Sequence, residues 1–200
     1  SSVKASTFSF YNSILNHHVL PALGNKRLNT VKEADIQLFV DDLIKRGLKP
    51  GTVRGIAGLV SRIFAAALSK RAVLINPCRD IRLPKEEKRQ SKVLERIEQE
   101  RLENAAEKDQ WGTAVLISLY TGMRIGEICA LKLEDVNLKE GTITVRRTLQ
   151  RITVPGGKTE KTRLIFNTPK SSYSNRRIPL TNRLCQLLKR EGEHRCGEYV

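Results

Sequence analysis

Arg124 lies in a segment whose residue types suit chemistry on a phosphate group. Residues 121–138 read TGMRIGEICALKLEDVNL, with a glycine-containing turn directly before the arginine. A guanidinium at the start of a helix can bind nonbridging phosphate oxygens through two parallel hydrogen bonds. Those oxygens gain negative charge during phosphodiester cleavage, and preorganised positive charge stabilises that state. Glu127 follows near one helical turn later and could hold the arginine in place. The alternative is an ordinary surface arginine in a helix-turn-helix.

A second candidate is Lys170, in the segment NTPKSSYSNRRIPL over residues 167–180. A lysine ammonium can donate a proton to a departing alkoxide, which is otherwise a poor leaving group. The alternative is an exposed hairpin lysine that contacts backbone phosphates without chemistry. Lys158 and Lys161, in the same predicted sheet region, compete weakly for the role.

The charge balance predicts a polyanionic partner. The chain has 200 residues, with 36 Lys and Arg against 21 Asp and Glu, a net charge of +15 and a pI near 10.0. Neutralising phosphates is the most common use of so positive a field. Hydrophobic residues make up 40% of the chain, so it can build a core and general disorder is not expected.

Several classes of protein are disfavoured by what the sequence lacks. No apolar run is expected to approach the roughly 20 residues that span a bilayer, so we predict no membrane partner. Cys78, Cys129, Cys185 and Cys196 show no metal-binding spacing and are expected to be reduced thiols. The histidines fit no HExxH motif. We therefore predict no metal and no cofactor.

The elements that must position these residues divide into two domains. Apolar stripes at helical spacing, 8–19, 36–44 and 53–67, predict a small helical bundle, with Pro21 expected to end the first helix. The polar run RLPKEEKRQSK over residues 82–92 is typical of a linker, which could track a DNA backbone or be merely solvated. We expect a helical domain over 1–82, a basic linker over 83–93 and a second domain over 94–200.

The second domain is predicted to be mixed. Helices are expected from Leu94 onward, including a short one over 125–133. Strands follow over 141–150, 163–167 and 177–180, with a turn at residues 154–157, and Thr181 caps a last helix. The fold class is therefore mainly α with a small antiparallel sheet: a helical bundle followed by an α+β domain.

Residues 121–138 resemble the first catalytic box of the tyrosine recombinases. In that family the box reads Thr-Gly-apolar-Arg, two residues, Glu, then an apolar turn and a Leu-x-x-x-Asp ending. Arg124, Glu127 and Asp135 match it, while Leu133 stands where the family often has an aromatic residue. Residues 167–180 resemble the family's β-hairpin, with Lys170 at the position of its catalytic lysine. The style of both segments favours an integrase of a mobile genetic element.

The resemblance implies a site-specific DNA recombinase that acts through a 3′-phosphotyrosyl intermediate. It assigns catalysis to Arg124 and Lys170, with Glu127 in support, and makes the first domain a core-binding, SAM-like DNA-binding domain. The predicted contacts to double-stranded DNA are Arg54, Arg62, Lys132, Arg176 and Arg177. The resemblance also implies that the full-length protein assembles as a tetramer on DNA and that it acts in the bacterial cytoplasm.

The family's His-x-x-Arg box and tyrosine nucleophile are not visible in this chain. Tyr11 and Tyr120 lie in apolar helical patterns and are interpreted as core, while Tyr173 and Tyr199 lack a nucleophile's setting. We therefore expect these 200 residues to bind DNA without cleaving it. Two alternatives stay open: a non-catalytic DNA-binding protein or repressor on the same scaffold, and an RNA-binding protein, which the 5% aromatic content disfavours.

Overall fold

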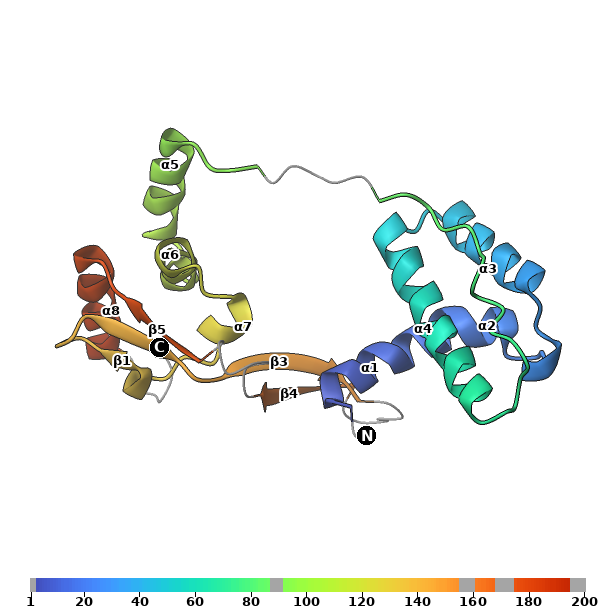
Figure 1. The fold of residues 1–200 in the computed structure, drawn as a ribbon. Coiled ribbons are helices and arrows are strands. Elements are labelled where there is room, and N and C mark those ends of the chain that lie inside the picture. The colour runs from blue at the N-terminus through green and yellow to red at the C-terminus, as the bar shows by residue number, and fades with distance from the viewer. Residues whose placement is uncertain (1–2, 87–91, 155–160, 168–174, 195–200) are drawn as a thin grey trace. The chain divides into compact units, whose positions relative to one another are not determined.

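The chain forms two compact units, Ser1–Ser91 and Lys92–Val200. The structure is a computed structural model that describes residues 3–86, 92–154, 161–167 and 175–194, and the side chains as far as residue 191 (Figure 1). The division between the units falls inside the linker expected over 83–93. Each unit is described by itself.

Unit 1 is built from helices. They are α1 (Ala5–Ile14), a π-helical turn η1 (Leu15–Val19), α2 (Leu20–Leu23), a short 3-10 turn η2 (Leu28–Thr30), α3 (Glu33–Lys45) and α4 (Pro50–Ser69). The expectation that Pro21 ends the first helix was wrong, because the chain continues helically to Leu23. Pro21 falls in the first turn of α2, where a missing N–H is tolerated, and the wider π turn precedes it.

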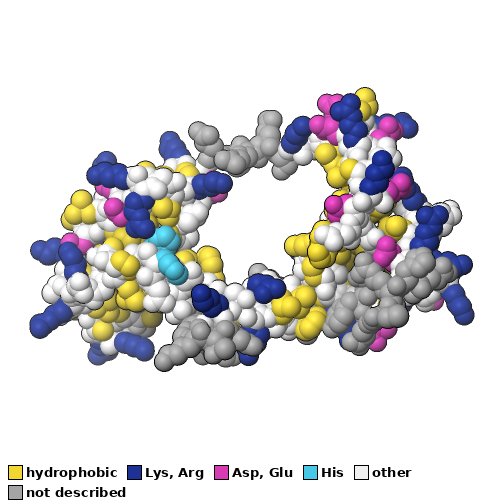
Figure 2. Space-filling view, turned by 180° about the vertical axis from the view of Figure 1, so that it is seen from behind, with side chains coloured by type: hydrophobic (Ala, Val, Ile, Leu, Met, Phe, Trp, Pro, Cys, Tyr) yellow, Lys and Arg dark blue, Asp and Glu magenta, His cyan; other side chains and the backbone are white. Residues whose placement is uncertain are grey.

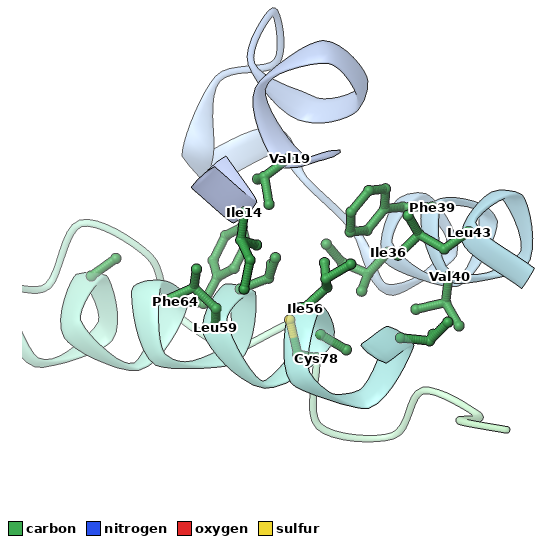
Figure 3. Packing of buried hydrophobic residues seen from close by; sticks show 14 of the residues in the cluster. Ile14, Val19, Ile36, Phe39, Val40, Leu43, Ile56, Leu59, Phe64 and Cys78 are labelled. Carbon is green, nitrogen blue, oxygen red and sulfur yellow. The ribbon is translucent and has the colours of Figure 1, made fainter. Parts of the chain in front are cut away.

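The core of unit 1 lies where these helices meet. Figure 3 shows Ile14 and Val19 packed with side chains of α3 and α4, with the sulfur of Cys78 among them. Ile81 and Leu83 pack against the same core, so the start of the predicted linker folds back on the helices. The predicted helical bundle is confirmed. Its completely buried residues, each exposed by no more than 1%, are Ile36, Val40, Leu43, Val53 and Ile56.

Helix α4 corrects one expectation. It is 20 residues long with a mean hydropathy of 1.3 over its most apolar window, enough by length and composition to cross a membrane. The prediction of no apolar run near that length is therefore wrong for α4. Seven residues of α4 are buried in the bundle, as in the core helix of a globular domain.

Unit 2 begins with α5 (Arg96–Ala106), α6 (Gly112–Thr121) and α7 (Ile125–Ile128), followed by a 3-10 turn η3 (Leu133–Asp135). Gly122 ends α6 in the left-handed region, at φ +64°, where a residue without Cβ is favoured. Helix α7 is shorter than the predicted 125–133: it ends at Ile128, and Ala130 and Leu131, which follow it, are buried. The last helix, α8 (Asn182–His194), begins as predicted, with Thr181 Oγ1 accepting a hydrogen bond from Leu184 N.

The strands that the structure describes in unit 2 form two antiparallel sheets. One has the order β1 (Val136–Asn137), β2 (Thr142–Val145) and β5 (Arg176–Pro179), and the other pairs β3 (Thr148–Thr153) with β4 (Thr162–Asn167). The strand expected over 141–150 is thus divided between two sheets. The break falls at Arg146 and Arg147, where the apolar alternation ends and Arg147 turns to pair with acidic residues. The fold class, mainly α with small antiparallel sheets, is confirmed.

The core of unit 2 joins its sheet to its helices. Ile143 and Val145 of β2 pack with Ile117 of α6 and with Leu184 and Leu188 of α8. The sheet that carries β5 is therefore fixed against the helix that precedes the Gly122 turn, which places the strand and the turn in one rigid core.

Candidate active site

A buried carboxylate lies at the centre of the candidate site. The side chain of Glu127 is only 6% exposed and accepts four hydrogen bonds. Arg176 donates two of them, from Nη1 to Oε1 at 3.1 Å and from Nη2 to Oε2 at 2.8 Å. Arg124 donates the others, from its backbone N to Oε2 at 3.0 Å and from Nη1 to Oε1 at 3.2 Å. The Arg176 guanidinium above all holds the pKa of Glu127 down to about 2, against the opposing effect of burial.

Arg124 is fixed at its backbone and open at its side chain. It caps α7, and the preceding Met123 is buried, with its N donating to Thr121 Oγ1 at 3.2 Å. The Arg124 side chain nevertheless remains 77% exposed. Because the backbone is already ordered, little further conformational entropy of the backbone is lost when the guanidinium binds an anion. The geometry therefore suits an exposed phosphate-binding cation.

Arg176 lies on the inward face of β5. In the sheet register it stands opposite Val145, while Arg177 stands opposite Thr144. Its side chain is 30% exposed, and the carboxylate of Glu127 raises its pKa. Sequence reasoning placed Arg176 among the DNA contacts and missed its ion pair with Glu127. A DNA contact by Arg176 stays a prediction.

A second buried carboxylate supports the turn that carries Lys132. The side chain of Asp135 is 1% exposed, and its Oδ2 accepts a hydrogen bond from Lys132 N at 3.1 Å. Arg147 donates from Nη2 to Asp135 at 3.0 Å and to Glu134 at 2.8 Å. Sequence reasoning also missed this cluster, although two adjacent arginines that interrupt a strand pattern were the available signal.

The other predicted DNA contacts have partners within their own units. Arg54 and Arg62 of α4 belong to unit 1, where Arg54 Nη1 donates to Pro84 O at 3.0 Å and Arg62 Nη1 donates to Tyr11 Oη at 2.6 Å. Arg177, in unit 2, is 67% exposed and pairs with Glu140 at 3.4 Å. Figure 2 shows Lys and Arg side chains spread over the visible surface of both units. The structure brings together Arg124, Glu127 and Arg176, and unit 1 carries a separate set of cations.

Several candidates fall outside the described residues. Lys170 is one, together with Lys158, Tyr173 and Tyr199. Lys161 is described and exposed. The other two tyrosines, Tyr11 and Tyr120, are partly buried against the two cores, as predicted.

No metal site is formed by the part of the chain that the structure describes, where no three His, Cys, Asp or Glu side chains cluster. Three cysteines there are free: Cys78, which is buried, Cys129, which is exposed, and Cys185. Burial raises the pKa of Cys78 to about 11, so this thiol is held neutral. The exposure of Cys129 differs from the apolar setting expected for it.

Comparison with known proteins places the chain in a family. The profile of the phage integrase family matches residues 92–199, and that of the phage integrase N-terminal SAM-like domain matches residues 1–44. The chain belongs to the phage integrase family. The matched range includes Arg124, Glu127 and Arg176.

Among its relatives is the tyrosine recombinase XerC-like protein of Caldanaerobacter subterraneus subsp. tengcongensis, 25% identical over 96% of this chain and 50% of the relative. The ICEBs1 integrase of Bacillus subtilis is 26% identical over 88% of this chain and 46% of the relative. The chain thus spans about half the length of these relatives. A solved structure of the Tn1549 transposon integrase in complex with a circular intermediate DNA has a similar fold, with a TM-score of 0.81 at 21% identity over 98% of this chain and 62% of that one.

Proposed function

We propose that this chain is the core-binding domain and the first part of the catalytic domain of a tyrosine-type, site-specific DNA recombinase of a mobile genetic element. Arg124 binds the scissile phosphate and Lys170 protonates the leaving 5′ oxygen, while Glu127 holds Arg124. The chain binds DNA without cleaving it, because neither a His-x-x-Arg box nor a tyrosine in a nucleophile's setting is visible in these 200 residues.

One observation carries the proposal: an exposed arginine whose backbone is fixed by a buried carboxylate, in a chain of the phage integrase family. Four hydrogen bonds to Glu127 preorganise this site before any substrate arrives. Preorganisation of this kind is what stabilises charge that develops on a phosphate in the transition state. The mobile-element assignment is supported by the relatives' names, which include an ICEBs1 integrase.

The partner in this proposal is double-stranded DNA. The net charge of +15 favours a polyanion, and the Tn1549 integrase of similar fold was solved with DNA. We propose contacts from Arg54, Arg62, Lys132 and Arg177. The complete protein would assemble as a tetramer on its recombination sites in the bacterial cytoplasm, with no membrane partner, metal or cofactor.

The test is binding of the 200-residue chain to labelled duplex DNA over a range of salt concentrations, beside single-stranded RNA of equal length. We expect tighter binding to the duplex, an affinity that falls steeply with salt, and no covalent product. Arg54→Ala and Arg62→Ala should each weaken binding and reduce the salt slope by about one phosphate contact. Preference for the RNA, or a salt-independent affinity, would count against the proposal.

A further inference from the structure

We propose that Arg176 is a positioning residue that neutralises Glu127 and thereby leaves the charge of Arg124 free for phosphate. The inference rests on the proposed function, because it concerns the same phosphate site. It assigns Arg176 a role through Glu127, in place of a direct role on DNA.

The charges of the three residues carry the first step. Two arginines share one carboxylate, so the group has one positive charge in excess. Arg176 is 30% exposed and Glu127 is 6% exposed, whereas the Arg124 side chain is 77% exposed. The carboxylate is therefore paired mainly with the more buried arginine, and the excess charge lies on the exposed one.

The hydrogen-bond geometry carries the second step. Arg176 binds both oxygens of Glu127 in a bidentate pair, at 2.8 and 3.1 Å. This pair fixes the plane of the carboxylate, so that Oε2 also accepts from the Arg124 backbone N at 3.0 Å. Arg124 keeps only one side-chain bond to Glu127, the 3.2 Å contact from Nη1. The remaining donors of its guanidinium can turn toward a ligand.

Removal of the Arg176 side chain would change which arginine pairs with Glu127. Glu127 would remain buried without its main partner, and a buried carboxylate draws the nearest cation to itself. The nearest remaining cation is Arg124. Its guanidinium would then form the bidentate pair with Glu127 and lose its availability to phosphate. Lysine at position 176 would restore the charge but not the bidentate geometry.

The experiment measures the salt dependence of duplex-DNA binding by the 200-residue chain. If Arg124 contacts one phosphate, Arg124→Ala lowers the slope of log K against log salt by about 0.9. Arg176→Met should produce the same loss, and adding Arg124→Ala to it should change nothing further. Arg177→Met is the matched control, because Arg177 is adjacent on β5 but pairs with Glu140. Its effect should add to that of Arg124→Ala.

A double variant separates positioning from a merely structural role. Arg176→Met with Glu127→Gln removes both charges of the buried pair, so Arg124 is no longer captured. We expect this variant to recover the slope lost in Arg176→Met, and Arg176→Lys to recover part of it. Additive losses from Arg176→Met and Arg124→Ala, or no recovery in the double variant, would overturn the inference.

A measurement without DNA keeps the two proposals distinct. The Nε–Hε signal of Arg124 in NMR spectra reports exchange with water. Exchange should be fast in the unmodified chain, slower in Arg176→Met and fast again in the double variant. Failure of the unmodified chain to bind DNA would contradict the proposed function alone, whereas unchanged Arg124 exchange in Arg176→Met would contradict the positioning role alone.

Discussion

Replacement of Glu127 by Gln should destabilise unit 2 in a way that depends on pH. The folded-state pKa of Glu127 is lowered from 4.5 to about 2, chiefly by Arg176. A carboxyl group whose pKa is lowered by folding contributes stability above its unfolded pKa, and that contribution is lost as pH falls through the folded pKa. The shift corresponds to about 3 kcal/mol at pH 7 and about 1.5 kcal/mol at pH 3.

The assay is urea denaturation of the chain and of Glu127→Gln at several pH values between 3 and 7. Trp111 is the single tryptophan and lies in unit 2, so its fluorescence reports on the unit that contains Glu127. The difference in unfolding free energy between the two proteins isolates Glu127 from the other carboxyl groups. A difference that stays constant from pH 7 to pH 3 would refute the reasoning.

Three further predictions concern residues other than those of the Arg124–Glu127–Arg176 group. Asp135→Ala should destabilise unit 2 by about 3 kcal/mol, because it leaves Arg147 and the Lys132 N–H without their buried acceptor. Glu134→Ala removes a more exposed partner of Arg147 and should cost less than about 1 kcal/mol. Equal losses of unfolding free energy in urea denaturation would contradict this. Leu184→Ala should cost about 3 kcal/mol by the same assay, since Leu184 is completely buried, and a loss below about 1 kcal/mol would argue against its place in the core. Iodoacetamide should label the exposed Cys129 in the folded protein well before Cys78, because burial raises the pKa of Cys78 to about 11. Peptide mapping by mass spectrometry would show the order of labelling, and the opposite order would be inconsistent with the structure.

The helices could be predicted from sequence because their signals are local. The apolar stripe of Val53, Ile56, Val60 and Phe64 recurs at the helical period, and all four residues are buried on α4. The prediction that Pro21 ends the first helix failed because a proline disrupts a helix only beyond its first turn. The π turn that precedes Pro21 could not be predicted from residue type.

The partners of Glu127 could be predicted only in part. Arg124 lies three residues away and within reach along the chain, so a contact was expected and is present. Arg176 lies 49 residues away, and its pairing depends on the register of β2 with β5, which a single sequence does not specify. One signal was available: residues alternate across a strand, so Arg176 shares the face of Ile178, which packs against the core of unit 2.

The central claim, that Arg124 serves a recombinase site, is tested most directly in any longer protein that the gene containing this chain encodes. That protein would be incubated with a nicked duplex of its recombination site, which traps the covalent intermediate. The account predicts a 3′-phosphotyrosyl adduct that Arg124→Ala abolishes in a protein that remains folded. A longer protein that forms no adduct, or an adduct that Arg124→Ala leaves unchanged, would contradict it.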